Sequence, residues 1–234
     1  MNIKQISETK YYIIISLAII MFLITAPLTY FTFSEHFYMN QLEKNNVSIS
    51  NSEKLTKNII EYLKGNEELD NNFSKNEINH MQDVKKLIDL AKLIMFISAA
   101  IIIISILLAL FIIKKLLKLL KAIFFGALVT LAILILIALG AMFNFGSSFA
   151  YFHELFFPQG NWMFPQGSLL ITLLPQSFFV SISQAIFTSG IILSLTLIVL
   201  THFSIKNNKK RAKQINKEKT KTRKTRKKNK NKKK

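Results

Sequence analysis

The stretch Leu93–Phe143 reads LIMFISAAIIIISILLALFIIKKLLKLLKAIFFGALVTLAILILIALGAMF. Two apolar blocks are separated in it by the short link KKLLKLLK. A helix needs about 20 apolar residues to cross roughly 30 Å of hydrocarbon, and each block has this length. Membrane β-strands are shorter and alternate in polarity, so continuous blocks of this kind predict helices. The stretch therefore predicts two membrane-spanning helices.

The remainder of the chain extends this pattern. Half of the 234 residues are hydrophobic, which is too many for an ordinary soluble domain of this size. Further apolar blocks lie near both ends, and the predicted spans are 11–33, 88–113, 122–143 and 178–203. The first block is too long for a secretory signal and lacks a cleavage pattern, so it is read as an uncleaved anchor. The predicted fold class is an all-α polytopic membrane protein with four transmembrane helices.

Positive charge predicts the orientation of these spans. The link 114–121 holds four Lys and no acidic residue, and the tail 204–234 holds seventeen Lys or Arg with one Glu. The loop 144–177 holds neither Lys nor Arg. Because Lys and Arg are retained on the cytoplasmic side, the link, the tail and the short N-terminal segment should be cytoplasmic. The loop and the segment 34–87 should then face outside.

The basic tail has two interpretations. It supplies +16 of the formal net charge of +18, and beside a span such a tail usually binds anionic inner-leaflet lipid. The alternative is a disordered tail that only enforces the topology. The tail contains no aromatic residue that could stack on bases, which argues against nucleic acid as a partner.

The outer segment 34–87 is polar and is expected to form a small helical cap. Ser50 with Glu53, and Ser74 with Glu77, have the spacing of a capping box at a helix start. The second helical pattern continues into the second span without a breaker. For the segment around residue 80 to lie near the membrane, the hydrocarbon should begin near residue 87, with Asp89 and Lys92 facing the bundle.

Two histidines are candidates for chemistry. His80 lies three residues from Glu77 and from Asp83, close enough for contact on a helix. His153 lies beside Glu154 in an aromatic, otherwise uncharged loop. A surface histidine between charges would explain the first, and an interfacial aromatic belt would explain most of the second. The chain has no cysteine and no HExxH-like spacing, so no disulfide, thiolate or metal site is expected.

Three motifs together resemble one family. HMQDVKKLI (80–88) leads into a span, and FHELFFPQGNWMFP (152–165) and LLPQSFF (173–179) follow. This arrangement resembles the lipoprotein intramolecular transacylases, the Lit family, over the chain up to about residue 203. The resemblance implies an enzyme without a cofactor that moves the sn-2 acyl chain of a diacylglyceryl-modified lipoprotein to the α-amino group of its N-terminal Cys. It implies His80 and His153 as catalytic residues. Asp83 and Glu154, close to them in sequence, are candidate orienting residues, and Lys85 is a candidate for charge screening or substrate contact.

A histidine suits this reaction because a base with a pKa near neutrality is needed to free the amine, and an acid is needed to protonate the departing glyceryl oxygen. The aromatic residues of the loop are expected to form a dry substrate pocket; they are Phe149, Tyr151, Phe152, Phe156, Phe157, Trp162 and Phe164. The site is expected at the outer face of a bacterial cell membrane. Two alternatives stay open: a non-enzymatic membrane sensor or assembly factor, and another histidine-dependent acyltransferase or phospholipase.

Overall fold

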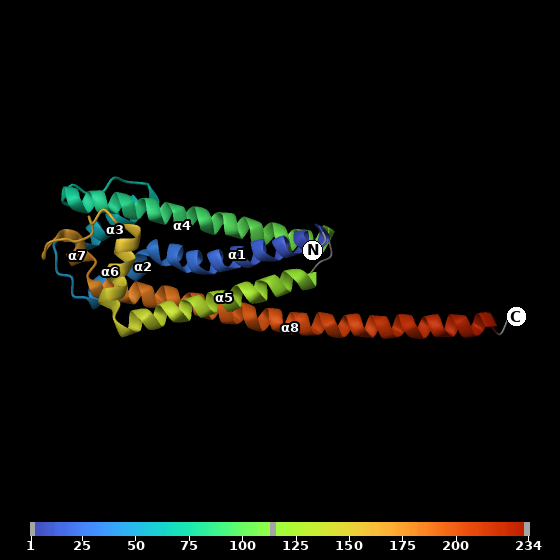
Figure 1. The fold of residues 1–234 in the computed structure, drawn as a ribbon. Helices are drawn as coiled ribbons and strands as arrows, with labels where there is room; N and C mark the ends of the chain where they lie inside the picture. The colour runs from blue at the N-terminus through green and yellow to red at the C-terminus, as the bar shows by residue number, and fades with distance from the viewer. Residues whose placement is uncertain (1–2, 113–115, 232–234) are drawn as a thin grey trace.

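Four long helices form the body of the protein. The computed structural model describes residues 3–112 and 116–231, and its long helices are α1 (Ile3–Thr32), α4 (Lys75–Leu107), α5 (Leu116–Phe143) and α8 (Gln176–Asn231). α1 packs against α4 on one side and against α5 and α8 on the other (Figure 1). Each is long and apolar enough to cross a membrane, which confirms the predicted four-span fold. Lys114 and Lys115 of the predicted link lie outside the described residues.

Small residues bring these helices close together. A Cβ on Gly126 would lie 2.9 Å from the carbonyl oxygen of Ser16, so no larger residue fits where α5 crosses α1. Beside this point the hydroxyl of Ser16 donates to the carbonyl of Ala122 over 3.1 Å. In lipid, helices associate through such close packing and polar contacts, because apolar burial gives little net gain there.

The cap is built at one end of the bundle from short helices. These are α2 (Glu35–Lys44), α3 (Ser52–Lys64), α6 (Phe145–Phe156) and α7 (Leu169–Leu173), together with the first turns of α4 (Figure 1). Its core joins segments far apart in sequence: Tyr38, Leu55, Ile59, Ile60, Tyr62, Leu63, Leu69, Phe73, Met81, Leu170, Leu173, Leu174 and Phe178. Three of the helices, α2, α6 and α7, were not predicted from the sequence. The cap core therefore fixes the start of α4 against the segment that follows α6.

The two predicted capping boxes have different outcomes. Ser74 caps α4 as predicted, since its side chain accepts from the backbone of Glu77 and the Glu77 side chain accepts in return. The prediction for Ser50 was wrong. The N-cap of α3 is Asn51, one residue later than predicted. Asn51 has a left-handed backbone (φ 61°), and its side chain makes no capping hydrogen bond. A left-handed backbone is tolerated best by Asn after Gly, which explains why the turn is placed there.

The predicted inward orientation of Asp89 was wrong. Its side chain is 48% exposed, and it pairs with Lys92 at 3.3 Å and with Lys85 at 3.8 Å along the surface of α4. Ile88 and Ala91 are the buried residues of this turn. Lys92 lies over the ring of Phe33, 5.4 Å from its centroid. Two neighbouring ammonium groups satisfy the carboxylate at the surface, so it has no need of a partner inside the bundle.

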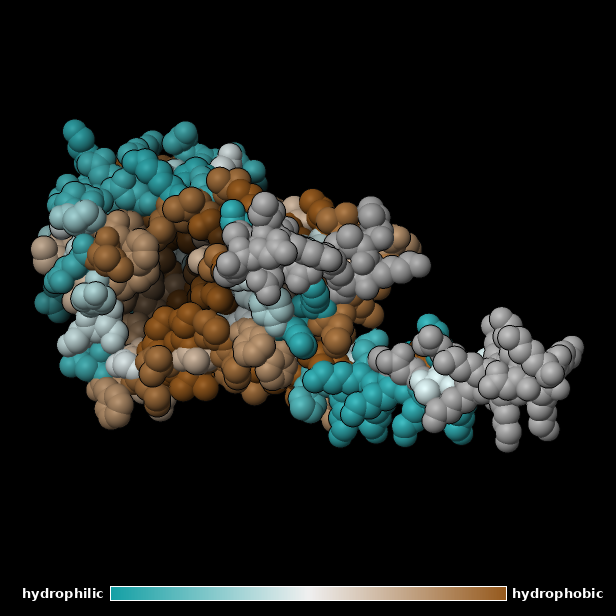
Figure 2. All heavy atoms as spheres, turned by 45° about the vertical axis from the view of Figure 1, so that its right-hand side comes forward, coloured by the Kyte–Doolittle hydropathy of each residue, from teal (hydrophilic) through white to brown (hydrophobic). Residues whose placement is uncertain are grey.

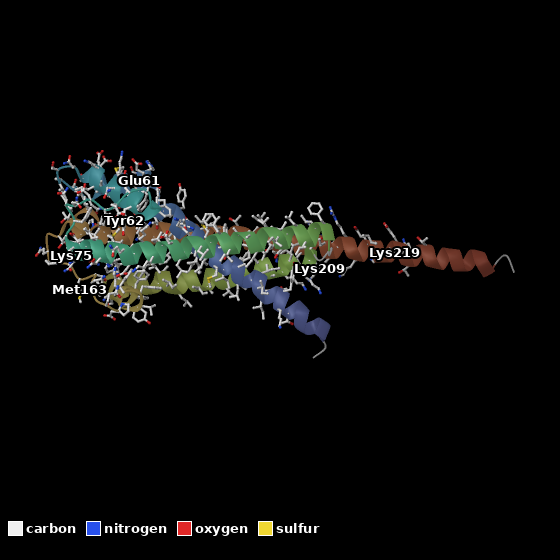
Figure 3. All side chains as sticks on the ribbon, turned by 90° about the horizontal axis from the view of Figure 1, so that it is seen from above. Glu61, Tyr62, Lys75, Met163, Lys209 and Lys219 are labelled. Atoms are coloured by element: carbon white, nitrogen blue, oxygen red, sulfur yellow. The ribbon has the colours of Figure 1, made fainter. Side chains whose placement is uncertain are left out.

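The basic tail differs from the disordered tail expected from the sequence. α8 continues without interruption from the last span to Asn231, well past the other helices (Figure 1). Lys209 and Lys219 lie along this extension (Figure 3). No Gly or Pro follows the span, and Lys, Arg, Gln and Glu are good helix formers, so nothing in the sequence ends the helix. Hydrophilic residues cover the cap and the described part of the extension, whereas hydrophobic residues cover much of the body between them (Figure 2).

Candidate active site

The first turn of α4 is anchored by a buried carboxylate. Glu77 is 2% exposed, and its Oε2 accepts from the backbone N–H of Ser74 over 2.7 Å. Its Oε1 accepts from the backbone N–H of Leu170, at the start of α7, also over 2.7 Å. One side chain thus closes the α4 cap and ties α4 to the segment after the aromatic loop. This anchor lies one helical turn before His80.

We predict that Glu77→Ala destabilises the protein by about 1–3 kcal/mol, because it leaves buried backbone N–H groups without acceptors. The thermal unfolding midpoint in detergent should fall. Glu53→Ala, an exposed acidic residue in the first turn of α3, serves as the control and should leave the midpoint nearly unchanged. An unfolding midpoint for Glu77→Ala equal to that of the wild-type protein would contradict the anchoring role.

His80 is enclosed by aromatic rings. It is buried on α4, and the ring centroids of Phe157 and Phe164 lie 4.9 Å and 5.5 Å from its own, both edge-on. Burial lowers the pKa of His80, and the side chain of Asn161, which lies beside the ring, opposes this lowering by favouring the charged form. Nδ1 of His80 is buried and has no partner among the described residues. A buried polar atom without a partner is costly, so an unpaired imidazole nitrogen is a natural contact for a substrate.

His153 is held by its own helix. Asn144 caps α6, its side chain accepting from the backbone of Ser147 over 3.0 Å. Nδ1 of His153 contacts the carbonyl oxygen of Phe149 at 2.7 Å. Because a carbonyl only accepts, this contact places the proton on Nδ1 and leaves Nε2 as a bare acceptor. The rings of Phe149 and Trp162 pack on the imidazole with centroids at 4.0 Å and 4.9 Å.

The two histidines meet where the cap joins the spans. They come from different helices, yet their ring centroids lie 6.1 Å apart and their planes are nearly parallel, at 26°. Phe157 touches both rings, 5.5 Å from His153 by centroid. The Phe149 carbonyl engages Nδ1 of His153 and leaves its Nε2 for chemistry, and Nδ1 of His80 has no partner among the described residues. Two imidazole rings with centroids 6.1 Å apart can act on one small reacting group.

Burial lowers the pKa of His153 below its ordinary value of 6.5, and the hydrogen bond to the Phe149 carbonyl opposes this only in part. Removing the imidazole from water disfavours its charged form. At neutral pH the ring is therefore neutral, which is the form that accepts a proton. The electrostatics and the hydrogen bonding agree in presenting His153 as a base.

The predicted supporting residues fall in different places. Asp83 lies one turn after His80 and accepts from Asn161 over 2.9 Å. The interpretation of Glu154 as an orienting residue is corrected, because its side chain is exposed and the carbonyl of Phe149 takes that role. Lys85 is corrected as well: it lies over the ring of Tyr62 and pairs with Asp89, on the face of α4 opposite to His80.

Only some of the aromatic residues predicted to line the pocket contact the histidines. Phe157, Trp162, Phe164 and Phe152 contact one or both histidine rings. Phe156 is 46% exposed and packs on Phe152, so it lies further from the histidine rings than Phe152 does. The prediction that Tyr151 lines the pocket was wrong. Tyr151 precedes His153 by two positions in α6, so it lies on the opposite face of the helix, and it is 68% exposed.

Sequence reasoning included Phe149 among the aromatic residues of the pocket but missed the role of its carbonyl, and it missed two further site residues, Gln159 and Asn161. A signal for the last two was present: the tetrapeptide FPQG occurs at 157–160 and again at 164–167. The first residue of each copy is a phenylalanine in contact with His80. Both copies end in a glycine with positive φ, 74° at Gly160 and 85° at Gly167. The repeat therefore marks two turns beside one histidine, although their closing hydrogen bonds differ: the N–H of Gly160 donates to Phe157 in the first, and that of Ser168 donates to Pro165 in the second.

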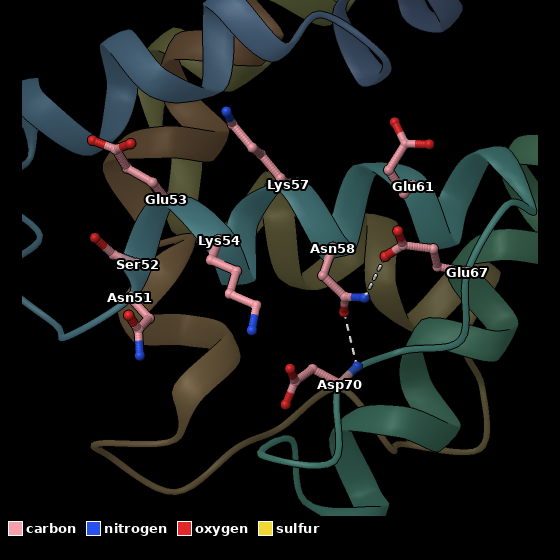
Figure 4. A pocket seen from close by; sticks show the side chains of 9 residues that line it. All are labelled: Asn51, Ser52, Glu53, Lys54, Lys57, Asn58, Glu61, Glu67 and Asp70. Atoms are coloured by element: carbon pink, nitrogen blue, oxygen red, sulfur yellow. Dashed lines mark hydrogen bonds between the residues drawn. The ribbon is translucent and has the colours of Figure 1, made fainter.

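A polar groove lies elsewhere on the cap. It has a volume of about 770 Å³ and is lined by α3 and the segment after it, where Asn58 bridges Glu67 and the backbone of Asp70 (Figure 4). Neither histidine lines it. The groove is hydrophilic and lacks the nitrogen pair, so we place the chemistry at His80 and His153.

The fold and this site define a membrane-integral enzyme with a buried pair of histidines. The profile of the family described as lipoprotein intramolecular transacylase Lit matches residues 8–179, about three quarters of the chain. The chain therefore belongs to this family, and it is a multi-pass membrane acyltransferase that moves an acyl group within a lipoprotein.

Solved structures share its fold. The membrane-integral lipoprotein intramolecular transacylase Lit from Bacillus cereus is similar with a TM-score of 0.76 and 22% identity, over 87% of this chain and 98% of that one. A variant of the same protein, with one histidine replaced by alanine, is similar with a TM-score of 0.73 and 21% identity, over 88% of this chain and 97% of that one. A search among curated protein sequences finds no significant match.

Proposed function

We propose that this enzyme moves the sn-2 acyl chain of an S-diacylglyceryl lipoprotein to the α-amino group of its N-terminal Cys, which leaves a lyso-form lipoprotein. The observation that supports this most is the pair of buried histidines, 6.1 Å apart by ring centroid, where the cap meets the spans. Transfer within one molecule needs a donor ester and an acceptor amine held close together, and no activated co-substrate. Positioning alone supplies a large part of such a barrier.

The amine must lose its protons. An α-amino group has a pKa of about 8, so the substrate arrives mostly as an ammonium ion at neutral pH. The unpaired Nδ1 of His80 takes the first proton and frees the amine. The amine nitrogen then attacks the sn-2 carbonyl carbon, and the bare Nε2 of His153 takes the second proton as the N–C bond forms.

The glyceryl oxygen must then leave. An alkoxide is a poor leaving group, so the protonated His80 returns its proton to this oxygen as the C–O bond breaks. The products are an amide and a free hydroxyl, with one proton left on His153 for release to solvent. That released proton balances the conversion of an ammonium ion into a neutral amide.

The aromatic surroundings favour transfer over hydrolysis. Phe157 and Phe164 cover His80, and Phe149 and Trp162 cover His153. A hollow bordered largely by hydrophobic residues opens on the face drawn in Figure 2. We assign the acyl chains to this hollow. Rings that exclude water from the ester protect the intermediate from hydrolysis.

A synthetic diacylglyceryl lipopeptide with an isotope-labelled sn-2 chain tests the proposal with the purified enzyme. Transfer keeps the parent mass and moves the label to nitrogen. A phospholipase would release the labelled fatty acid, and another acyltransferase would place the label on a second molecule. A sensor would leave the lipopeptide unchanged; family membership already disfavours that alternative.

The pH dependence follows from His153. Its pKa lies below the ordinary value because of burial, and the neutral ring is the active form. We therefore expect kcat/KM to persist as the pH falls through 6.5 and to drop only below it, when His153 becomes protonated. A series measured in detergent between about pH 5 and about pH 8 checks this. An acid limb centred above 7 would contradict the assignment of His153 as the base.

We propose that the cap faces the outside and that both termini are cytoplasmic in the cell membrane of a bacterium. The Lys-rich end of the bundle then meets the inner leaflet, in agreement with the retention of basic residues there. Lys206, Lys209, Lys210 and Arg211 are the first charges after the last apolar turns of α8. Charge attraction decays over about 10 Å, which is about seven residues of helix, so these four are assigned to anionic headgroups.

Anionic lipid should slow tryptic cleavage between Lys206 and Arg211 in nanodiscs, and zwitterionic lipid should not. Sites beyond Lys217 should be cleaved equally in both lipids and serve as the internal control, because they lie beyond the range of the surface charge. High salt should abolish the protection. Equal cleavage of the first group of sites in the two lipids would refute the lipid contact.

A further inference from the structure

We propose that Asn161 is a positioning residue for the acyl transfer, which connects Asp83 to His80 and holds the proton of that histidine on Nε2. This inference rests on the proposed function, because it assigns a role at the same site. It concerns a residue that is held by Asp83 and lies beside the histidine.

Asp83 gathers the ends of three side chains. Its Oδ2 accepts from Asn161 Nδ2 over 2.9 Å and from Gln159 Nε2 over 2.8 Å, and its Oδ1 pairs with Lys86 over 2.9 Å. The carboxylate is on α4, three residues after His80, so it lies one turn along nearly the same face of the helix. The loop after α6 is thereby fixed to the helix that carries His80.

These contacts orient the amide of Asn161. Because Nδ2 donates to Asp83, the Oδ1 atom is left as an acceptor, and Gln159 lies 3.4 Å from it. The Asn161 side chain lies beside the His80 ring and favours its charged form, and Nδ1 of His80 has no partner in the described part of the chain. We therefore assign the contact with the Oδ1 atom of Asn161 to the remaining ring nitrogen, Nε2. A proton held on Nε2 by an amide oxygen leaves Nδ1 bare.

Asn161 thus does for His80 what the Phe149 carbonyl does for His153. In each case a neutral oxygen accepts from one ring nitrogen and frees the other. A carboxylate in direct contact would favour the charged imidazolium, whereas an amide between them orients the ring without adding a charge. His80 therefore stays ready to accept the first proton of the substrate ammonium.

The first FPQG turn is built to present these two amides. Pro158 restricts the backbone, and Gly160 has a φ of 74°, a conformation that few other residues adopt. The backbone N–H of Gly160 donates to the carbonyl of Phe157 over 3.0 Å and closes the turn. Gln159 and Asn161 then reach the same carboxylate. The second copy places its glutamine, Gln166, at the surface, which gives a matched control within the chain.

The test compares Asn161→Leu with Gln166→Ala in the labelled lipopeptide assay. We expect Asn161→Leu to lower kcat about 10- to 100-fold with little change in KM, as orienting partners of reactive groups commonly do. Gln166→Ala should match the wild-type enzyme. Asp83→Leu should lower kcat similarly, and the double variant should be no worse than either single variant, because the two residues act as one unit.

A second readout separates positioning from folding. Nitrogen NMR of the histidine rings should show the proton of His80 on Nε2 in the wild-type protein, and a mixture of ring protonation sites in Asn161→Leu with an unchanged unfolding midpoint. Wild-type kcat and a single His80 tautomer in Asn161→Leu would overturn the inference while the enzyme itself remains active. Additive losses in the double variant would also overturn it. A wild-type enzyme that fails to move the label would instead overturn the proposed function.

Discussion

Replacing His153 by alanine is expected to lower the rate of acyl transfer about 10²- to 10⁴-fold, the usual contribution of a positioned general base. The variant loses the nitrogen that takes the second proton of the amine. Its fold should persist, because the hydrogen bond of His153 stays within α6. The single-turnover rate on the labelled lipopeptide measures the effect.

Two controls define the role of His153. Added imidazole should restore part of the lost rate, because it can take the second proton in place of His153. Raising the pH to about 9 removes only the first proton of the substrate ammonium, so it should restore little. Glu154→Ala, the exposed neighbour of His153, should retain activity close to that of the wild-type enzyme. A His153→Ala enzyme with more than half of the wild-type rate would exclude His153 as the base.

His80→Ala is expected to cost a similar factor, about 10²- to 10⁴-fold, for a different reason. This variant cannot protonate the departing glyceryl oxygen. It also cannot take the first proton of the substrate ammonium, so the rescue is measured at about pH 9, where the amine is already free. At that pH a substrate analogue that departs as a more acidic alcohol needs no proton, so it should restore most of the rate to His80→Ala. The same analogue should do little for His153→Ala, whose defect lies in the attack of the amine.

The discriminating result is that the activated analogue restores the rate of His80→Ala but not that of His153→Ala. If the activated analogue rescued both variants equally, the division of labour between the histidines would be wrong. If it rescued neither variant, both residues would act at the attack step. His36→Ala, an exposed histidine of α2 that contacts Asn40, is the matched control and should leave both substrates unaffected.

Much of the fold could be predicted because its signals are local. Apolar blocks of spanning length identify the four membrane helices, and the Ser74–Glu77 spacing identifies the start of α4. The cap was predicted only in outline. α2 has no strong apolar face, and α6 lies in a segment so aromatic that its helical start at Asn144 was not recognised.

The site could be predicted less completely, because it depends on contacts between distant segments. The two histidines stood out by residue type in their surroundings. The carbonyl of Phe149 was missed because backbone groups leave no trace in a sequence. The link from Asp83 to Asn161 joins residues 78 positions apart, so only the tertiary structure reveals it. Lys85 and Tyr151 were misplaced because closeness in sequence to a histidine was taken for a shared helix face.

The most direct measurement of the central claim uses a bacterial host whose lipoproteins carry only diacylglyceryl groups and free α-amines. Expressing this protein there and fragmenting the N-terminal lipopeptide by tandem mass spectrometry locates each acyl chain, whereas the unchanged parent mass does not. We predict fragments with one acyl chain on the Cys nitrogen, which disappear with His80→Ala and with His153→Ala. Fragments in which both acyl chains still leave with the glyceryl group, and the amine stays free, would contradict the account.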